Sequence, residues 1–245
     1  VKKIYFSTGT AYIIDANDNL WAWGDNSYNK LGQGNSYLVT EPIKILEGRT
    51  EGANNVKAKN IWAGPTNTFV LDTSNRLWVC GANSDGVLGQ GNNNIYYNFV
   101  EVKIDGLDLN STKIELYPMS INQQQYSSVI LKCSDGRVYG CGINKNGEFG
   151  IGTNTSYNKF IELSAYNNIW KNPKQIANQG ISLFVITQDG ELYSSGYNGY
   201  GILCLGHTNN INTLTKVTEN VKDVAIRANN NVVFLKESGD LYTNN

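Results

Sequence analysis

The feature that most constrains the fold of this chain is a glycine-rich loop sequence that occurs in four copies. Each copy begins with an apolar residue followed by Trp or Tyr, continues with Gly-x-Asn, and ends in further glycines at similar offsets. The copies begin at Leu20, Leu77, Val138 and Leu192, and the chain ends within a fifth that begins at Leu241. A repeat of this length indicates an array of similar supersecondary units.

A β-hairpin is predicted immediately before each glycine loop. An apolar run, a turn such as Asp135-Gly136 and a second strand recur, and the Asp-Gly pair supplies the positive φ that tight hairpin turns need. The predicted hairpins lie near residues 12–24, 69–81, 129–142, 184–196 and 233–242. A strand before each later hairpin and another after the loop, such as residues 160–163, bring each unit to roughly four strands with no helix.

Four-stranded units at this period predict an all-β fold, namely a β-propeller segment with about four to five four-stranded blades. The array covers residues 1–245, which we treat as one domain. Within each loop, the Asn two residues after the first Gly is expected to bond to the backbone of its own loop. Cys80 and Cys141 share one repeat phase and are interpreted as buried core positions, with a disulfide as the less favoured alternative.

These motifs resemble those of the regulator of chromosome condensation repeat family, also described as alpha-tubulin-suppressor-like repeats. The shared pattern is a hairpin turn, Leu-Trp or Leu-Tyr, and then Gly-x-Asn-x-x-Gly-x-Leu-Gly-x-Gly, and it covers nearly the whole chain. The resemblance implies a propeller, usually of seven blades, that acts by binding other macromolecules. One departure is that the His often found before the hairpin's apolar run is replaced here by Thr10, Asn67, Ser128, Ser182 and Asn231.

Several classes of chemistry are not supported by the composition. Lys and Arg total 20 against 21 acidic residues, with no cluster in the sequence, so nucleic-acid binding is not expected. No apolar run is long enough for membrane insertion. The single histidine, His207, argues against His-dependent catalysis and zinc, and Asp15 is interpreted as a turn residue rather than the start of a calcium loop. We therefore expect no enzymatic activity, no cofactor and no metal.

The candidate binding residues are tyrosines in or beside the glycine loops, where they stand among Asn, Ser and Gly. Tyr with Ser, Gly and Asn is typical of protein-recognition surfaces, because the ring is large, amphipathic and loses little entropy. The alternative is that these rings pack beneath the loops. The candidates are Tyr28, Tyr37, Tyr96, Tyr97, Tyr157 and Tyr200.

The expected function is therefore non-enzymatic recognition of another protein or a surface glycan through propeller loops. The composition, rich in Asn and Tyr, favours a bacterial or phage protein and an extracellular setting: a surface, secreted, toxin or phage-tail receptor-binding domain. The alternatives are a guanine-nucleotide exchange factor-like regulator of a small GTPase and a structural spacer. Four copies and a fifth hairpin do not close a seven-bladed ring, so we expect a segment of a longer array or an arc completed by another chain.

Overall fold

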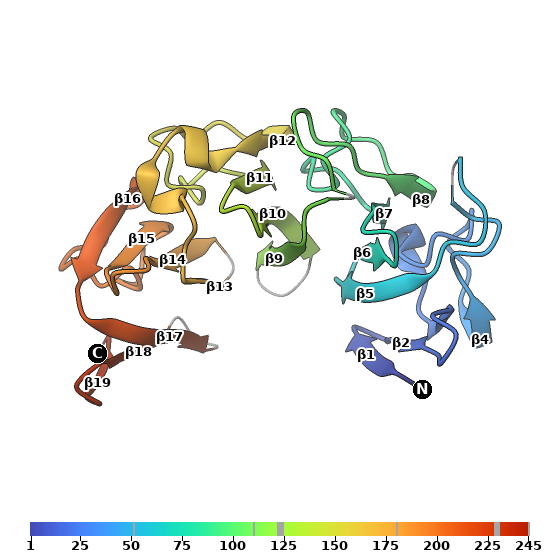
Figure 1. The fold of residues 1–245 in the computed structure, drawn as a ribbon, viewed down its shortest axis with the longest axis horizontal. Helices are drawn as coiled ribbons and strands as arrows, with labels where there is room; N and C mark the ends of the chain where they lie inside the picture. Colours follow the sequence, from blue (N-terminus) through green and yellow to red (C-terminus); the bar gives the residue numbers. More distant parts are fainter. Residues whose placement is uncertain (51, 110, 122–124, 180, 228–230, 245) are drawn as a thin grey trace.

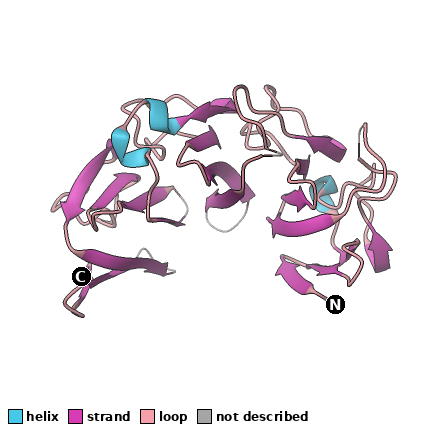
Figure 2. Ribbon diagram, in the orientation of Figure 1, coloured by secondary structure: helices cyan, strands magenta, loops and turns pink. Residues whose placement is uncertain are grey.

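The structure is a computed structural model of the 245-residue chain, and it describes all residues except 51, 110, 122–124, 180, 228–230 and 245. The described residues form five antiparallel sheets that follow one another along an open arc, with the two chain ends at opposite ends of the arc (Figure 1). Strands make up most of the ordered structure, and helix is confined to short 3-10 turns (Figure 2).

In each sheet the strands lie side by side in chain order, so every sheet is a simple meander. The first sheet contains β1 (Lys3–Ser7), β2 (Thr10–Ile14), β3 (Leu20–Gly24) and β4 (Val39–Lys44). The second contains β5 (Ala58–Ala63), β6 (Asn67–Asp72), β7 (Leu77–Gly81) and β8 (Tyr96–Glu101). The third contains β9 (Ile114–Ile121), β10 (Gln125–Cys133), β11 (Val138–Gly142) and β12 (Tyr157–Glu162).

The last two sheets follow the same plan. The fourth contains β13 (Gln175–Gln179), β14 (Ser182–Ile186), β15 (Leu192–Gly196) and β16 (Ile211–Thr218). The fifth has three described strands, β17 (Val221–Arg227), β18 (Asn231–Lys236) and β19 (Leu241–Thr243). The 3-10 turns are η1 (Ser27–Asn29), η2 (Leu163–Ala165) and η3 (Asn168–Trp170).

The first strand of each sheet lies on the inside of the arc, and the fourth strand of each four-stranded sheet lies on the outside (Figure 1). Inner strands of neighbouring sheets contact each other in three places, β1 with β5, β9 with β13 and β13 with β17. The second and third strands of each sheet form a β-hairpin, with equivalent register at Thr10 opposite Gly24 and Asn67 opposite Gly81. The all-β propeller architecture is therefore confirmed, and β1, which the sequence motifs did not reveal, completes the first sheet.

The hydrophobic core lies between neighbouring sheets rather than inside any one of them. Phe99 of β8 and Trp78 of β7 are both fully buried and pack in one cluster with Leu31 of the first glycine loop. Both β6 and β7 are buried along their whole length, because sheets cover both of their faces. Burial of apolar area between sheets is the main stabilising contribution, so each repeat depends on its neighbours.

Candidate functional site

Each of the four glycine loops is closed by a buried asparagine at the equivalent position. In the first loop, the Asn26 Oδ1 accepts a hydrogen bond of 2.9 Å from the Leu31 backbone N–H, and its Nδ2 donates to the Asn35 carbonyl at 2.7 Å. Equivalent pairs of bonds are made by Asn83, Asn144 and Asn198. The expectation that this Asn binds its own loop is confirmed, and because the bonds are buried they hold the loop rigidly.

In the first three loops, two glycines are required by close chain approach. Gly24 has φ 108°, and a Cβ there would lie 2.2 Å from the Gly9 carbonyl oxygen. Gly32 has φ 63°, and its Cβ would lie 2.5 Å from ring carbons of Phe99 in the next sheet. The loop of one sheet thus packs against the outer strand of the next. In the fourth loop Cys204 occupies the position of Gly32, with φ 58°.

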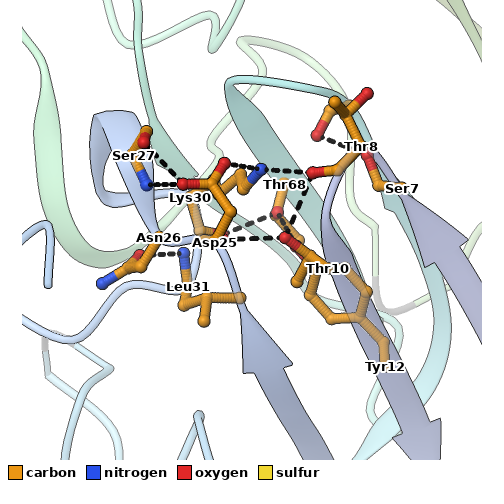
Figure 3. A network of polar contacts seen from close by, with 11 residues as sticks. Ser7, Thr8, Thr10, Tyr12, Asp25, Asn26, Ser27, Lys30, Leu31 and Thr68 are labelled. Atoms are coloured by element: carbon orange, nitrogen blue, oxygen red, sulfur yellow. Dashed lines mark hydrogen bonds and ion pairs between the residues drawn. The ribbon is translucent and has the colours of Figure 1, made fainter. Parts of the chain in front are cut away.

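The first loop differs from the others by a buried cation. Lys30 is fully buried, and its Nζ donates to the Asp25 carboxylate at 2.6 Å and to the Thr8 carbonyl at 2.9 Å (Figure 3). The equivalent positions of the later loops hold Val87, Glu148 and Ile202. The ammonium therefore ties the first loop to the turn between β1 and β2.

Asp25 is the counter-ion of this network, and it is partly exposed. Burial opposes its ionisation, but hydrogen bonds from Lys30 and Ser27 outweigh that effect and lower the pKa of Asp25 to about 2. The Lys30 carbonyl in turn accepts hydrogen bonds from Thr68 Oγ1 at 2.7 Å and Cys80 Sγ at 3.3 Å in the second sheet. One residue thus links the loop to its own sheet through its side chain and to the next sheet through its backbone.

The backbone of the first loop is strained just before this lysine. Tyr28 has φ 65° and ψ 13°, and Asn29 has φ 61°, so two consecutive non-glycine residues lie in the left-handed region. The later loops place a glycine at the position of Asn29, namely Gly86, Gly147 and Gly201. Such strain persists only where the surroundings enforce it, and it concentrates at functional sites.

The strained loop presents aromatic rings to solvent. Tyr28 is 56% exposed, Tyr37 77%, Leu38 69% and Tyr97 52%. Tyr97 is the second residue of β8, the outer strand of the second sheet. It lies beside the first loop, since the Gly34 N–H donates to the Tyr97 carbonyl at 2.9 Å and η1 contacts β8. We call these four residues the aromatic patch. Exposed Tyr on a rigid loop is suited to protein recognition.

The six tyrosines predicted from the sequence do not form one site. Tyr28, Tyr37 and Tyr97 belong to the aromatic patch. Tyr200 is 70% exposed on the fourth loop, where its ring meets that of Tyr197 edge-on. Two others are half-buried: the Tyr96 hydroxyl accepts from Asn92 Nδ2 at 2.8 Å, and the Tyr157 hydroxyl lies 3.4 Å from Thr153 Oγ1.

These positions separate four solvent-facing rings from the two packed beneath loops, and the binding role of all six stays a prediction. Two features of the site were missed in the sequence, Leu38 and the pair Asp25–Lys30. The signal for the pair was present, because a lysine stands at a position that two of the other copies fill with Val87 and Ile202.

The residues considered for catalysis, metal binding or a disulfide lie in turns, in the core or on the surface of a loop. The Asp15 carboxylate accepts four hydrogen bonds within its own turn, and the Asn19 and Trp21 side chains are the largest causes of its lowered pKa. Cys80 and Cys141 are buried free thiols whose pKa is raised by desolvation. His207 is exposed on the fourth loop. Within the described part of the chain, no group of three His, Cys, Asp or Glu is placed to hold a metal, and no helix is long and apolar enough to span a membrane.

Comparison with known proteins agrees with this architecture. Residues 17–71 match the family described as regulator of chromosome condensation (RCC1) repeat. The secretion-regulating guanine nucleotide exchange factor of Bos taurus is 29% identical over 134 residues, covering 54% of this chain and 26% of that protein. The X-linked retinitis pigmentosa GTPase regulator of Canis lupus familiaris is 26% identical over 181 residues, covering 70% of this chain and 17% of that protein.

Among solved structures, that of human WBSCR16 superimposes with a TM-score of 0.72 at 18% identity, covering 98% of this chain and 61% of that one. This likeness shows the propeller fold. The chain spans about a quarter or less of the length of the two curated relatives. The family resemblance seen in the sequence is thereby confirmed.

Proposed function

Because residues 17–71 match the regulator of chromosome condensation repeat and the later glycine loops share its motif, we propose that this chain is a non-enzymatic recognition module that binds a protein through the aromatic patch. The observation that carries the proposal is the exposure of Tyr28, Tyr37, Leu38 and Tyr97 on one loop–sheet junction. The buried Lys30 and the hydrogen bonds of Asn26 to the backbone of its own loop hold that junction in place. A rigid aromatic surface binds with little loss of conformational entropy.

The proposal is tested by variants that remove the patch without disturbing the core. Tyr37→Ser combined with Tyr97→Asn removes two exposed rings, and the second change introduces the residue type found at the equivalent Asn158 and Asn212. Tyr166→Ser is the matched control, because Tyr166 is 54% exposed and lies outside the patch. We expect a partner retained by the wild type and the control to bind the double variant at least about tenfold more weakly, because each ring supplies central contact area.

Quantitative affinity capture with the three proteins measures this effect, after thermal melting shows equal folding. Retention of every partner by the double variant would contradict the proposal, because the partners would then bind through another surface. Binding to a glycan array that depends on the same tyrosines would replace the protein partner with a carbohydrate.

A second candidate function is regulation of a small GTPase. The names of the two relatives, a guanine nucleotide exchange factor and a GTPase regulator, support this partner class. The test is the release rate of fluorescent GDP from a panel of small GTPases with and without the chain. Faster release that the Tyr37→Ser/Tyr97→Asn variant abolishes would establish the regulator; unchanged release across the panel would argue against it.

We further propose a bacterial or phage origin and an extracellular or cell-surface setting, as in a secreted, toxin or phage-tail domain. The richness of the sequence in Asn and Tyr supports this proposal. Protease treatment of intact source cells, followed by detection of the chain, tests the setting, because a surface domain is cleaved while cytosolic markers stay intact. Full protection of the chain would contradict it.

A further inference from the structure

A pocket of about 570 Å³ is lined by residues of the first three sheets. Its lining includes Lys3 of β1, Lys59 of β5, Lys113 just before β9 and Lys132 of β10. Lys3 and Lys113 lie at the start of inner strands, whereas the glycine loops follow the third strands at the opposite end of the sheets. This basic pocket is therefore separate from the aromatic patch.

The charge of the basic pocket is not balanced by the protein. Its lining holds these four lysines and one acid, Glu115, whose Oε2 accepts a hydrogen bond from the Tyr117 hydroxyl at 2.7 Å. The Lys3 Nζ donates to the Lys59 carbonyl at 2.9 Å and to an amide oxygen, and the Lys59 Nζ donates to Asn75 Oδ1 at 2.7 Å. Among the described residues, none of the four lysines forms an ion pair, although the chain as a whole carries a net charge of -1.

The floor of the basic pocket is apolar. Leu71 and Ile114 line it and are buried, and the half-buried ring of Trp62 lies on its wall. Such a floor packs against aliphatic carbons, while the lysine ammonium groups attract carboxylates. Aspartate and glutamate side chains carry both groups, a carboxylate on one or two methylenes.

We propose that the basic pocket binds an acidic peptide segment of a protein partner. The lysines come from three different sheets, so they are suited to several carboxylates along a segment rather than to one small anion. Nucleic acid fits less well, because it requires an extended basic surface that follows the phosphates, whereas here the excess of cations is confined to one pocket that also holds Glu115. This site goes beyond the proposed function, which concerns the other end of the sheets.

The test measures binding of a fluorescent decaglutamate peptide to the whole chain by anisotropy at low and at physiological salt. The variant is Lys113→Glu with Lys132→Glu, which reverses two cations of the pocket. The control is Lys103→Glu with Lys222→Glu, two exposed lysines outside the pocket, which changes the net charge equally. We expect the pocket variant to lose at least about tenfold in affinity, the control to lose less than about twofold, and binding to weaken as salt rises.

Each outcome decides the proposal. Equal losses in the pocket variant and the control would overturn it, because they would show attraction by overall charge alone. Binding of oligothymidine but not decaglutamate would overturn it in favour of nucleic acid. The Tyr37→Ser/Tyr97→Asn variant should bind decaglutamate as the wild type does. The test of the basic pocket therefore does not depend on whether the aromatic patch binds a partner. If the double reversal lowers the melting temperature, Lys113→Gln with Lys132→Gln replaces it, with an expected loss of at least about threefold.

Discussion

The junction between the first and second sheets differs from the two junctions that follow it, although all three are built from the same repeat. At the second junction Asn158 Nδ2 donates to Asn93 Oδ1 at 3.2 Å, and at the third Asn212 Nδ2 donates to Asn154 Oδ1 at 2.7 Å. The equivalent residues at the first junction are Tyr97 and Ser36. At the second and third junctions, a hydrogen bond between two Asn side chains thus joins the loop to the next sheet, whereas the first junction has the exposed ring of Tyr97 there.

The interior of the first junction differs as well. It contains the buried Lys30, and the carboxamide oxygens of Asn29 and Asn98 are buried there with no hydrogen-bond donor among the described residues. Buried polar groups without partners are rare, and they cost stability. The comparison teaches that the array departs from its shared arrangement at the first junction, the junction that carries the aromatic patch.

The largest predicted effect tests whether the buried cation depends on its carboxylate. Asp25→Ala leaves the Lys30 ammonium buried with the Thr8 carbonyl as its remaining described partner, and we expect a loss of about 3 kcal/mol in the free energy of unfolding. Denaturant unfolding measures it. Adding Lys30→Val reproduces the Ala82 and Val87 pair of the second loop and should recover most of the loss. Asp25→Ala without an effect would show that the ion pair contributes nothing.

The next effect separates a steric requirement from backbone strain. Gly32→Ala places a Cβ 2.5 Å from the Phe99 ring, while Gly206→Ala, at φ 75°, meets nothing within 4 Å. Both variants carry the cost of a left-handed alanine, so their difference isolates the clash between sheets. We expect Gly32→Ala to be less stable than Gly206→Ala by about 2 kcal/mol. Equal melting temperatures would mean that the sheets separate freely at this point.

A smaller effect is the pH dependence of the Asp25–Lys30 pair. The pKa of Asp25 falls from 3.8 to about 2 on folding, so its contribution to stability is present above about pH 4 and is lost as the pH falls through about 2. Because the carboxylate is partly exposed, we expect a loss of about 1 kcal/mol. Acid titration of unfolding measures it against the Asp25→Ala/Lys30→Val variant, which retains Asp15 and should lack only this component. Parallel curves for the two proteins would contradict the assignment.

The smallest effect concerns the amide pairs of the later junctions. Asn158→Ala and Asn212→Ala each remove one exposed hydrogen bond, and we expect a loss of no more than about 0.5 kcal/mol. The converse change, Ser36→Asn with Tyr97→Asn, should build the same pair at the first junction with an equally small change in stability. A loss above about 1.5 kcal/mol in either single variant would show that these pairs hold the sheets together.

By itself, the sequence determined the repeat architecture of this protein. The Asp-Gly turns, the strand residues and the spaced glycines specify hairpins and loops through short-range backbone preferences, and these act wherever the same residues recur. The same reasoning placed Tyr28, Tyr37 and Tyr97 in or beside loops, but it did not separate them from the half-buried Tyr96 and Tyr157.

Only the tertiary structure decided which side chains meet. Lys3, Lys59, Lys113 and Lys132 are scattered along the chain, and they line one pocket because three sheets converge there. Likewise, Tyr97 joins Tyr28 and Tyr37 because the outer strand of the second sheet packs against the first loop. Local propensity acts over a few residues, whereas burial, charge and exposure depend on how sheets pack, and that packing places the two candidate surfaces at opposite ends of the strands.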